Sequence, residues 1–479
     1  MTERFHGVQT REFTQVPRPV EIVDFSYFGL IGTAPNADAE NWPLNTPILV
    51  TGDRNVPAGL GSAGTLRDAL DGIFDQSNGQ GIIIRVEEGQ NIAETMGNII
   101  GDRLLGTGLH GFSRAFPDLG LKPRLLCAPG FTSQRPADGI SEITVGAGGE
   151  GYTEATVTFE AGVDGVVPLG AKARAVIEDG AITEIIIENP GTGGTAPVTV
   201  VITGDGEDAT ATATIGQVSN PVAAEMSGLC DRLRAMAVID GPNSTPEAAL
   251  QARQDWGTDR FMIVDPHVKV FKDGEVVTEP PSARVVGLQI RIDRERGFWH
   301  SPSNKEVRGI VGTSRAVTWG LSDPDTEAEY LNDREITTII RNINAGGFKL
   351  WGNRTTSDDP LKAFWSVRRT HDVVIESIER ASMPFVDEPF SVELLVNIGE
   401  TASSFLRQLR ARGAVIGSRV WLDTELNTPE TFVAGQLFIS YDAEGPAPAE
   451  NIIFHFYRNT GYYRELAEEA ARELARLAA

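Results

Sequence analysis

Short apolar runs alternate with amphipathic segments in the first quarter of the chain. The runs at 23–33, 47–52 and 81–86 have the length and the β-branched content of buried strands. Between the last two, residues 63–75 place leucine, isoleucine and phenylalanine side chains on one helical face. Strand, helix and strand at this spacing predict a βαβ unit.

The same alternation resumes after residue 219 and continues to the end of the chain. The longest amphipathic stretch, 462–477, places Leu466, Ala470, Leu474 and Leu477 on one face. We therefore expect a mixed α/β and α+β multidomain core. A helix is predicted to begin at Pro221, and another to follow the entry at 280–282, with Val285, Leu288 and Ile292 on one face. Further helices are predicted at 245–256, 323–332, 358–382 and 389–412, and strands at 237–240, 261–264, 335–342, 347–352, 414–422, 431–441 and 451–457, with a hairpin at 268–277.

Residues 135–218 differ from the rest of the chain in composition and in the pattern of their apolar residues. They are rich in Gly, Thr, Ala and Val and carry short alternating runs. The segment contains two similar units related by a shift of 42 residues, in which Ile143 corresponds to Ile185 and Val157 to Thr199. Internal repetition with glycine-rich turns predicts a small all-β repeat domain inserted into the α/β core.

The charge distribution limits the classes of partner. The formal net charge is −24, which argues against a general nucleic-acid binder, because phosphate neutralisation needs basic patches. Residues 137–216 carry 13 acidic and 2 basic residues, a balance of 2 − 13 = −11. No apolar run reaches the roughly 18 residues of a membrane span, and the first ten residues lack the apolar core of a secretory signal. Cys127 and Cys230 have no metal-site spacing and are interpreted as reduced core residues.

Candidate catalytic chemistry is weak. The six histidines form no i+3 or i+4 pair, and neither HExxH nor GxSxG occurs. The glycine-rich stretch 59–64 lacks the Gly-Lys-Ser/Thr ending of a phosphate-binding loop and is better explained as a tight turn. His371-Asp372 lies beside two arginines and is read as a surface ion network, and Asp358-Asp359 as charges at a helix start. We predict no catalytic, cofactor-binding or metal residues and no enzyme.

A rigid aromatic loop, 297–304, follows the helix predicted after the entry at 280–282 and the mixed-charge cluster 291–296. The loop has the sequence GFWHSPSN and resembles the tail sheath proteins of contractile phage tails, including prophage and R-type tailocin sheaths. Apart from roughly 135–218, the resemblance covers nearly the whole chain. Its motifs are Phe298, Trp299, Ser301, Pro302 and Asn304 in the loop, and the stretches 5–8, 43–47, 128–130, 350–355, 366–370 and 421–430.

The resemblance implies a subunit that polymerises helically, in stacked rings, around a tail tube and contracts to drive the tube through a cell envelope. The implied partners are other copies of the chain, the tail tube protein, and the baseplate and tail terminator proteins, with no direct nucleic-acid contact and no cofactor. The implied location is a virion tail or tailocin particle assembled in the bacterial cytoplasm. The implied parts are a linking arm (1–22), an α/β sheath region (23–134 with 219–345), the β insert (135–218) on the outer surface, a tube-facing C-terminal domain (346–458) and a terminal helix or arm (459–479).

Two groups of residues are candidates for assembly contacts. Sheath arms link subunits, so edge pairing is expected from residues of both terminal segments: Phe5, His6, Val8, Phe13, Ile452, Phe454 and Phe456. A frayed N-terminus is the alternative for residues 1–22. Arg407, Arg410 and Arg412 lie in a stretch without acids and either face an acidic tube or simply sit at a helix C-terminus.

Two other identities stay open at this point. A secreted β-repeat adhesin on an α/β carrier would also use the insert, and a type VI secretion sheath is a closer relative to consider.

Overall fold

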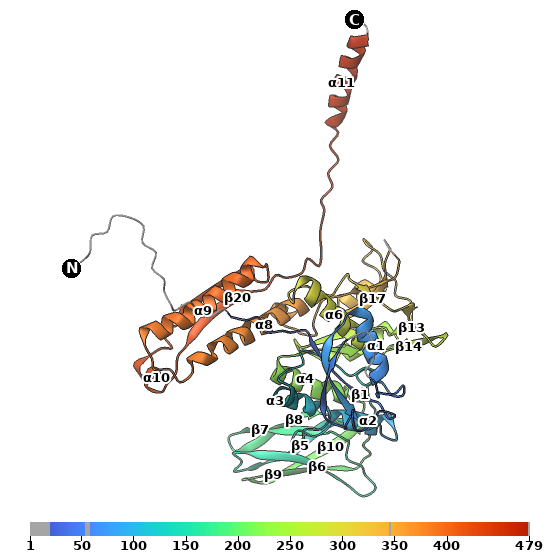
Figure 1. The fold of residues 1–479 in the computed structure, drawn as a ribbon. Helices are drawn as coiled ribbons and strands as arrows, with labels where there is room; N and C mark the ends of the chain where they lie inside the picture. The colour runs from blue at the N-terminus through green and yellow to red at the C-terminus, as the bar shows by residue number, and fades with distance from the viewer. Residues whose placement is uncertain (1–19, 53–57, 344–345, 478–479) are drawn as a thin grey trace, which may run out of the picture. The chain divides into compact units, whose positions relative to one another are not determined.

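The computed structural model describes residues 20–52, 58–343 and 346–477, and the chain divides into two compact units, 1–447 and 448–479. Within these ranges the first unit is built around a nine-stranded sheet of order β15-β18-β17-β12-β11-β4-β1-β3-β2 (Figure 1). Neighbours from β17 to β3 are parallel, and β2, β18 and β15 add antiparallel edges. The strands are β1 (Tyr27–Thr33), β2 (Pro47–Thr51), β3 (Gln80–Val86), β4 (Leu125–Cys127), β11 (Met236–Asp240), β12 (Phe261–Val264), β15 (Glu306–Val307), β17 (Ile336–Arg341) and β18 (Phe348–Trp351).

Helices cover both faces of this sheet, which is why its central strands are apolar on both sides. One face packs on α1 (Leu66–Gln76) and α6 (Ser282–Arg296). The other packs on α2 (Ile92–Ile100), η1 (Gly108–Arg114), α3 (Ala115–Leu119), α4 (Pro221–Leu233), α5 (Pro246–Gln254) and α7 (Glu327–Asn332). The expected α/β core is therefore present.

The predicted βαβ unit uses a different first strand from the one expected. β1, rather than β2, lies parallel to β3, while β2 pairs antiparallel with β3 at the sheet edge. The glycine-rich turn before α1 packs tightly on the end of β1: a Cβ added to Gly64, whose φ is +87°, would lie 2.3 Å from the carbonyl oxygen of Thr33. That carbonyl also accepts a 2.9 Å hydrogen bond from the amide of Thr65. Protein backbone thus occupies this helix start.

In residues 139–216, all of them described, a second sheet forms with the order β5-β10-β9-β6-β7-β8. The two central strands of this sheet, β9 and β6, pair symmetrically with respect to the repeat. Val157 pairs with Ile202, and the residues that correspond to these two after a shift of 42 positions, Thr199 and Glu160, also pair with each other. Tyr152, Val157, Ile182, Ile185 and Val200 form its small core. The strands are β5 (Gly139–Glu150), β6 (Ala155–Ala161), β7 (Lys172–Glu178), β8 (Ala181–Asn189), β9 (Val198–Gly204) and β10 (Glu207–Gly216).

A small sheet of order β14-β13-β16 packs beside α1 in the described chain, as the predicted hairpin at 268–277 with a third strand. Its strands are β13 (Val268–Lys272), β14 (Glu275–Glu279) and β16 (Gly312–Thr313).

A helical lobe with its own hydrophobic core follows β18. Phe405, Leu406 and Leu409 pack there against Val373 and Val374. The lobe contains η2 (Pro360–Lys362), α8 (Trp365–Ser382), η3 (Met383–Phe385), α9 (Val392–Ala411), β19 (Gly417–Leu422), α10 (Pro429–Val433) and β20 (Ile439–Glu444).

Four details of this half differ from the sequence predictions. β17 and β18 form one hairpin across residue 346, so the expected domain boundary falls inside the main sheet. The helix expected from 358 begins at Trp365, because Asp359 instead caps η2 by accepting from the amide of Leu361. Part of the strand expected at 431–441 is α10, which a Thr428–Thr431 capping box initiates. Residues 448–458 belong with the terminal segment rather than with the lobe.

The second unit consists of an extended segment and helix α11 (Tyr462–Leu477). Every residue from 449 to 477 is exposed. The strand expected at 451–457 is not formed, because the described chain supplies no strand to pair with it. The strand prediction is wrong here, because an alternating apolar pattern favours an extended backbone but a strand also needs a neighbour for its backbone groups.

Candidate assembly surfaces

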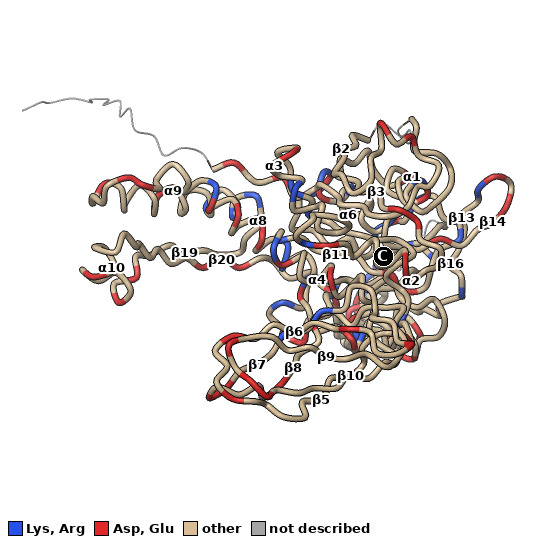
Figure 2. The backbone as a smooth tube through the Cα atoms, turned by 90° about the horizontal axis from the view of Figure 1, so that it is seen from below, with Lys and Arg blue, Asp and Glu red and all other residues tan. Residues whose placement is uncertain are grey.

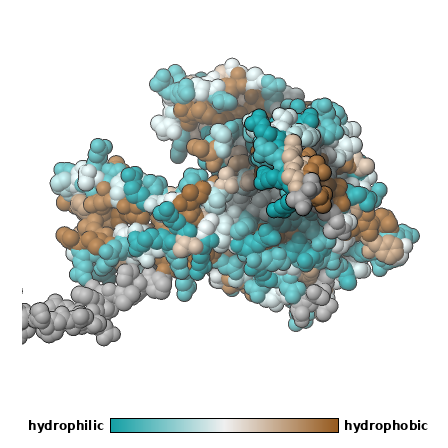
Figure 3. All heavy atoms as spheres, turned by 90° about the horizontal axis from the view of Figure 1, so that it is seen from above, coloured by the Kyte–Doolittle hydropathy of each residue, from teal (hydrophilic) through white to brown (hydrophobic). Residues whose placement is uncertain are grey.

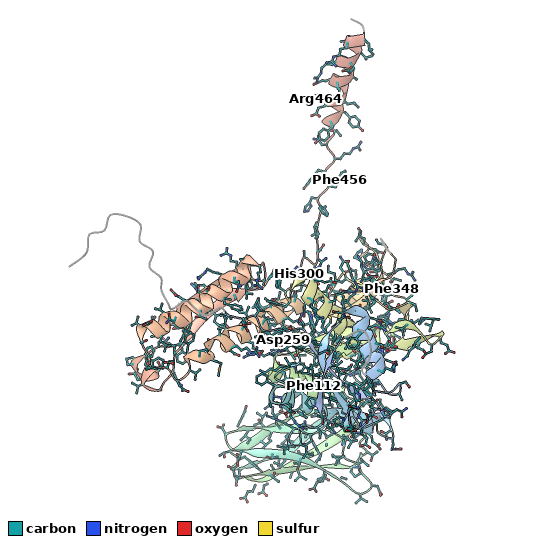
Figure 4. The ribbon with its side chains drawn as sticks, viewed as in Figure 1. Phe112, Asp259, His300, Phe348, Phe456 and Arg464 are labelled. Atoms are coloured by element: carbon teal, nitrogen blue, oxygen red, sulfur yellow. The ribbon has the colours of Figure 1, made fainter. Side chains whose placement is uncertain are left out.

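The aromatic loop after α6 lies at a junction inside the subunit. Phe298 is 8% exposed and belongs to the lobe core, with Trp299 in edge contact at 5.1 Å between ring centroids. Asn304 adopts a left-handed φ of 58°, and its amide donates to the carbonyl of Leu350 at 2.7 Å. Pro302 is buried, and Ser301 accepts from the amide of Ser303. The motif therefore fixes α6, β18 and the lobe to one another (His300 marks the place in Figure 4).

Helix α8 is tied to the sheet region by buried charges. Arg369, with 0% side-chain exposure, donates to both carboxylate oxygens of Asp293 at 2.8 and 2.6 Å, and to the carbonyl of Phe25 at 3.1 Å. One and two turns further on, Asp372 pairs with Arg260, and Glu376 with Arg124. Charged side chains on every turn of one helical face thus point into the protein instead of into water.

The ion network around His371-Asp372 is therefore not a surface feature. Asp372 has 1% side-chain exposure and is held by Arg260 and Arg368, which also contact Asp259 (Figure 4). Burial raises the pKa of Asp372, and the two arginines partly offset this. The prediction failed because the alternation of arginine and acid does not reveal which face of a helix is covered.

Arg407, Arg410 and Arg412 lie at the exposed C-terminal end of α9. Arg407 donates to Ser403 at 2.7 Å, and none of the three has a carboxylate within ion-pair distance in the described chain. Arg407 and Arg410 are one turn apart and share a face. The local positive charge inferred from the sequence is therefore exposed, in a chain that carries 66 acidic and 42 basic residues, whose positions along the backbone are red and blue in Figure 2.

The arm candidates fall into two groups. Phe5, His6, Val8 and Phe13 lie outside the described residues. Ile452, Phe454 and Phe456 are 67%, 89% and 90% exposed on the extended segment (Figure 4). Large apolar side chains at this exposure leave much apolar surface in water, which usually marks an interaction site.

The sequence did not single out the hairpin of β19 and β20 as a site. Val420, Tyr441 and Ala443 face the lobe core between α8 and α9, while Trp421 stacks under Arg419 at 4.2 Å on the other face. Over the described residues it is a sheet of two strands, so each strand has an outer edge without a neighbour. Two-stranded sheets are marginally stable alone and their open edges accept further strands.

Neither metal nor membrane chemistry is evident in the described part of the chain. It contains no group of three or more His, Cys, Asp or Glu placed to hold a metal ion. No helix there is long and apolar enough to cross a bilayer. Cys127 and Cys230 are both fully buried thiols, and burial raises their pKa values.

The described chain thus combines an α/β sheet, a helical lobe tied to it by buried ion pairs, an exposed apolar tail and a hairpin with open edges. The family of the phage tail sheath protein central domain matches residues 206–356, and that of the phage tail sheath C-terminal domain matches residues 357–458. The tail sheath protein of Burkholderia phage BcepMu is 30% identical, over 94% of this chain and 95% of its own length. The tail sheath protein of Escherichia phage P2 is 28% identical over the same shares.

Solved structures show the same fold. The sheath complex of the extracellular contractile injection system PVC, in its contracted state, superposes with a TM-score of 0.60 at 18% identity, covering 96% of this chain and 99% of that one. The contracted helical sheath of the anti-feeding prophage gives 0.58 at 18% identity, covering 95% and 99%. The chain therefore belongs to the phage tail sheath protein family, a family of structural subunits, as its motifs predicted. The adhesin alternative is not supported by these comparisons.

Proposed function

We propose that this chain polymerises helically around a tail tube and that the polymer shortens to drive the tube through a target envelope. The similar structure from the anti-feeding prophage is a helical sheath in the contracted state, and that from PVC is a sheath complex in the contracted state. The observation that carries the proposal is the tail: residues 451–457 expose their apolar side chains and leave their backbone groups without a partner strand in the described chain. We expect such a segment to be completed by a strand of another molecule.

The hairpin of β19 and β20 is the acceptor that fits this tail. Edge addition would pair the backbone of Ile452–Phe456 with an open strand of a neighbouring copy and cover its aromatic side chains. The main-chain hydrogen bonds of this pairing would keep neighbouring subunits joined while the helix changes pitch. Residues 1–22 are proposed as a second link of the same kind.

The subunit itself is expected to move as one body. Arg369, Asp372 and Glu376 bind α8 to the sheet region through buried ion pairs, and breaking them would leave uncompensated charges. The work of contraction is then done at contacts between subunits. Arg407, Arg410 and Arg412 are proposed to hold an acidic tube surface in the extended state and to release it on contraction.

The β insert is proposed to be a duplicated domain on the outer surface of the particle. Its symmetric strand pairing supports duplication, and its acidic balance of −11 supports exposure to solvent. It rests on α4 through Lys172, which pairs with Glu225 at 2.8 Å, and Asn189, which donates to the carbonyl of Pro221. Both contacts lie far in sequence from the lobe that carries the assembly surfaces.

Expression of the chain alone, followed by negative-stain electron microscopy, tests the proposal. We expect hollow, striated tubes wider than a bare tail tube. If only monodisperse particles form at high protein concentration and over a range of salt concentrations, the chain is next co-expressed with the tube protein. Sheaths that form around the tube would support the proposal, and their absence would overturn it.

A further inference from the structure

Helix α11 carries an apolar stripe that nothing covers in the described chain. Tyr463, Leu466, Ala470, Leu474 and Leu477 share one face, and the three leucines are 61%, 67% and 85% exposed. A lone helix of this length is marginal in water, and amphipathic helices are ordinarily stabilised by the surface they pack on. The stripe therefore indicates a docking partner.

The helical lobe has a complementary surface at the first half of α9. We call Val392 and Val396, which lie one turn apart on α9 and are 80% and 50% exposed, the α9 apolar face. Val386 and Phe390, which are 60% and 41% exposed, lie in the segment just before the helix, where Phe390 stacks on Phe432 of α10. Gly399 continues this face by one turn, and a Cβ added there would meet no atom within 4 Å, so a second helix can approach closely. Figure 3 shows apolar side chains gathered over this lobe. The second half of α9, by contrast, is buried through Phe405, Leu406 and Leu409.

We infer that α11 of one copy docks on the α9 apolar face of a neighbouring copy. This inference rests on the proposed function, since it requires the strand addition at β19 and β20. β19 of that hairpin packs on α9 and β20 on α8, with Val420 and Tyr441 against the lobe core, so a tail paired with the hairpin lies on the lobe that carries the α9 apolar face. Only residues 458–461 separate the paired segment from α11, and four residues span at most about 14 Å.

The dimensions of the two helices agree. α11 has 16 residues and α9 has 20, which correspond to about 24 and 30 Å. Helix-in-groove recognition reads anchors at i, i+3, i+4 and i+7, and Leu466, Ala470, Leu474 and Leu477 supply that spacing. Each copy would thus be joined to its neighbour by a strand and then clamped by a helix, which resists peeling of the strand.

Disulfide trapping in mixed polymers tests the docking. One chain carries Leu466→Cys and a second, larger tagged chain carries Val396→Cys, and the two are assembled together and oxidised. The native Cys127 and Cys230 are fully buried and stay out of the reaction. The matched control, Arg472→Cys, places the thiol on the opposite face of α11.

We expect heterodimers on a non-reducing gel at least about tenfold more abundant with Leu466→Cys than with Arg472→Cys. Leu474→Cys with Val392→Cys is a second pair, for the case in which the first perturbs packing. Polymers that form but show no excess over the control overturn the docking and leave the proposed function intact. A cross-link found only when both cysteines are on one chain overturns the assignment to a neighbour. Absence of polymers, with and without tube protein, overturns the proposed function itself.

Discussion

Arg369→Met is the sharpest test of the buried coupling between α8 and the sheet region. The substitution keeps an unbranched apolar stem but removes the guanidinium that binds both oxygens of Asp293 and the carbonyl of Phe25. Asp293, with 2% side-chain exposure, would keep only the 2.7 Å hydrogen bond from Gln289. Removing one partner of a buried ion pair costs about 3–5 kcal/mol, because the remaining charge is left uncompensated.

Hydrogen exchange measured by mass spectrometry gives the local readout. A loss of 3–5 kcal/mol corresponds to about two to four orders of magnitude in the opening equilibrium. We expect this loss of protection in residues 365–444 but not in strands β1, β3 and β4. Arg407→Met is the matched control, because that exposed side chain makes only a hydrogen bond to Ser403, and surface changes of this kind fall within about 0.5 kcal/mol.

The double variant separates charge from packing. Adding Asp293→Leu to Arg369→Met removes the orphaned carboxylate, so we expect most of the lost protection to return, since buried pairs can often be replaced by apolar residues at little cost. If Arg369→Met changes exchange in α8 by less than tenfold, the buried pair does not tie the lobe to the sheet, and the single-body account of the subunit is refuted.

Four further outcomes follow from the same contacts. Deleting residues 2–18 should abolish polymers in electron micrographs while circular dichroism remains that of a folded chain; sheaths formed by the truncated protein would rule out the N-terminal link. Changing Arg407, Arg410 and Arg412 to Glu should prevent co-sedimentation with tube protein without lowering the melting temperature, whereas the exposed Arg114→Glu should not, and retained binding would reassign the arginines to helix capping. Burial alone would raise the pKa of Glu225, but hydrogen bonds from His110 and Lys172 outweigh it and hold the pKa at about 2, against an ordinary 4.5. The stabilisation from the ionised carboxylate is therefore present above pH 4.5 and is lost as the pH falls toward 2. Glu225→Gln should make the melting temperature fall less steeply with pH over that window, and an unchanged slope would contradict this account. Replacing 139–216 by a short Gly-Ser linker should lower thermal stability, because Glu225 loses Lys172, yet leave sheath assembly intact in electron micrographs; loss of assembly would place the insert at a subunit contact.

Local pattern determined much of this protein. Continuous apolar runs such as Ile82–Ile84 identify strands covered on both faces, and alternating runs between glycine turns identify each strand of the 139–216 sheet. This works because a strand buried on both faces needs apolar residues at every position, whereas a strand buried on one face needs them at every second position. The aromatic loop and the other motifs identified the family. The expected absence of an acid near Arg407, Arg410 and Arg412 could also be read off the chain.

Only the tertiary structure decided which charges are inside. Arg369, Asp372 and Glu376 look like an ordinary solvated helix face, since a sequence does not say what covers each face, and their partners Asp293, Arg260 and Arg124 are 76 to 252 residues away. The open hairpin and the α9 apolar face were likewise invisible, because a strand edge or a helix face is unpartnered only with respect to the rest of the fold. The segment 451–457 shows the converse limit. Its pattern favours a strand, but a strand is a property of two segments, and within the described chain the second one is absent.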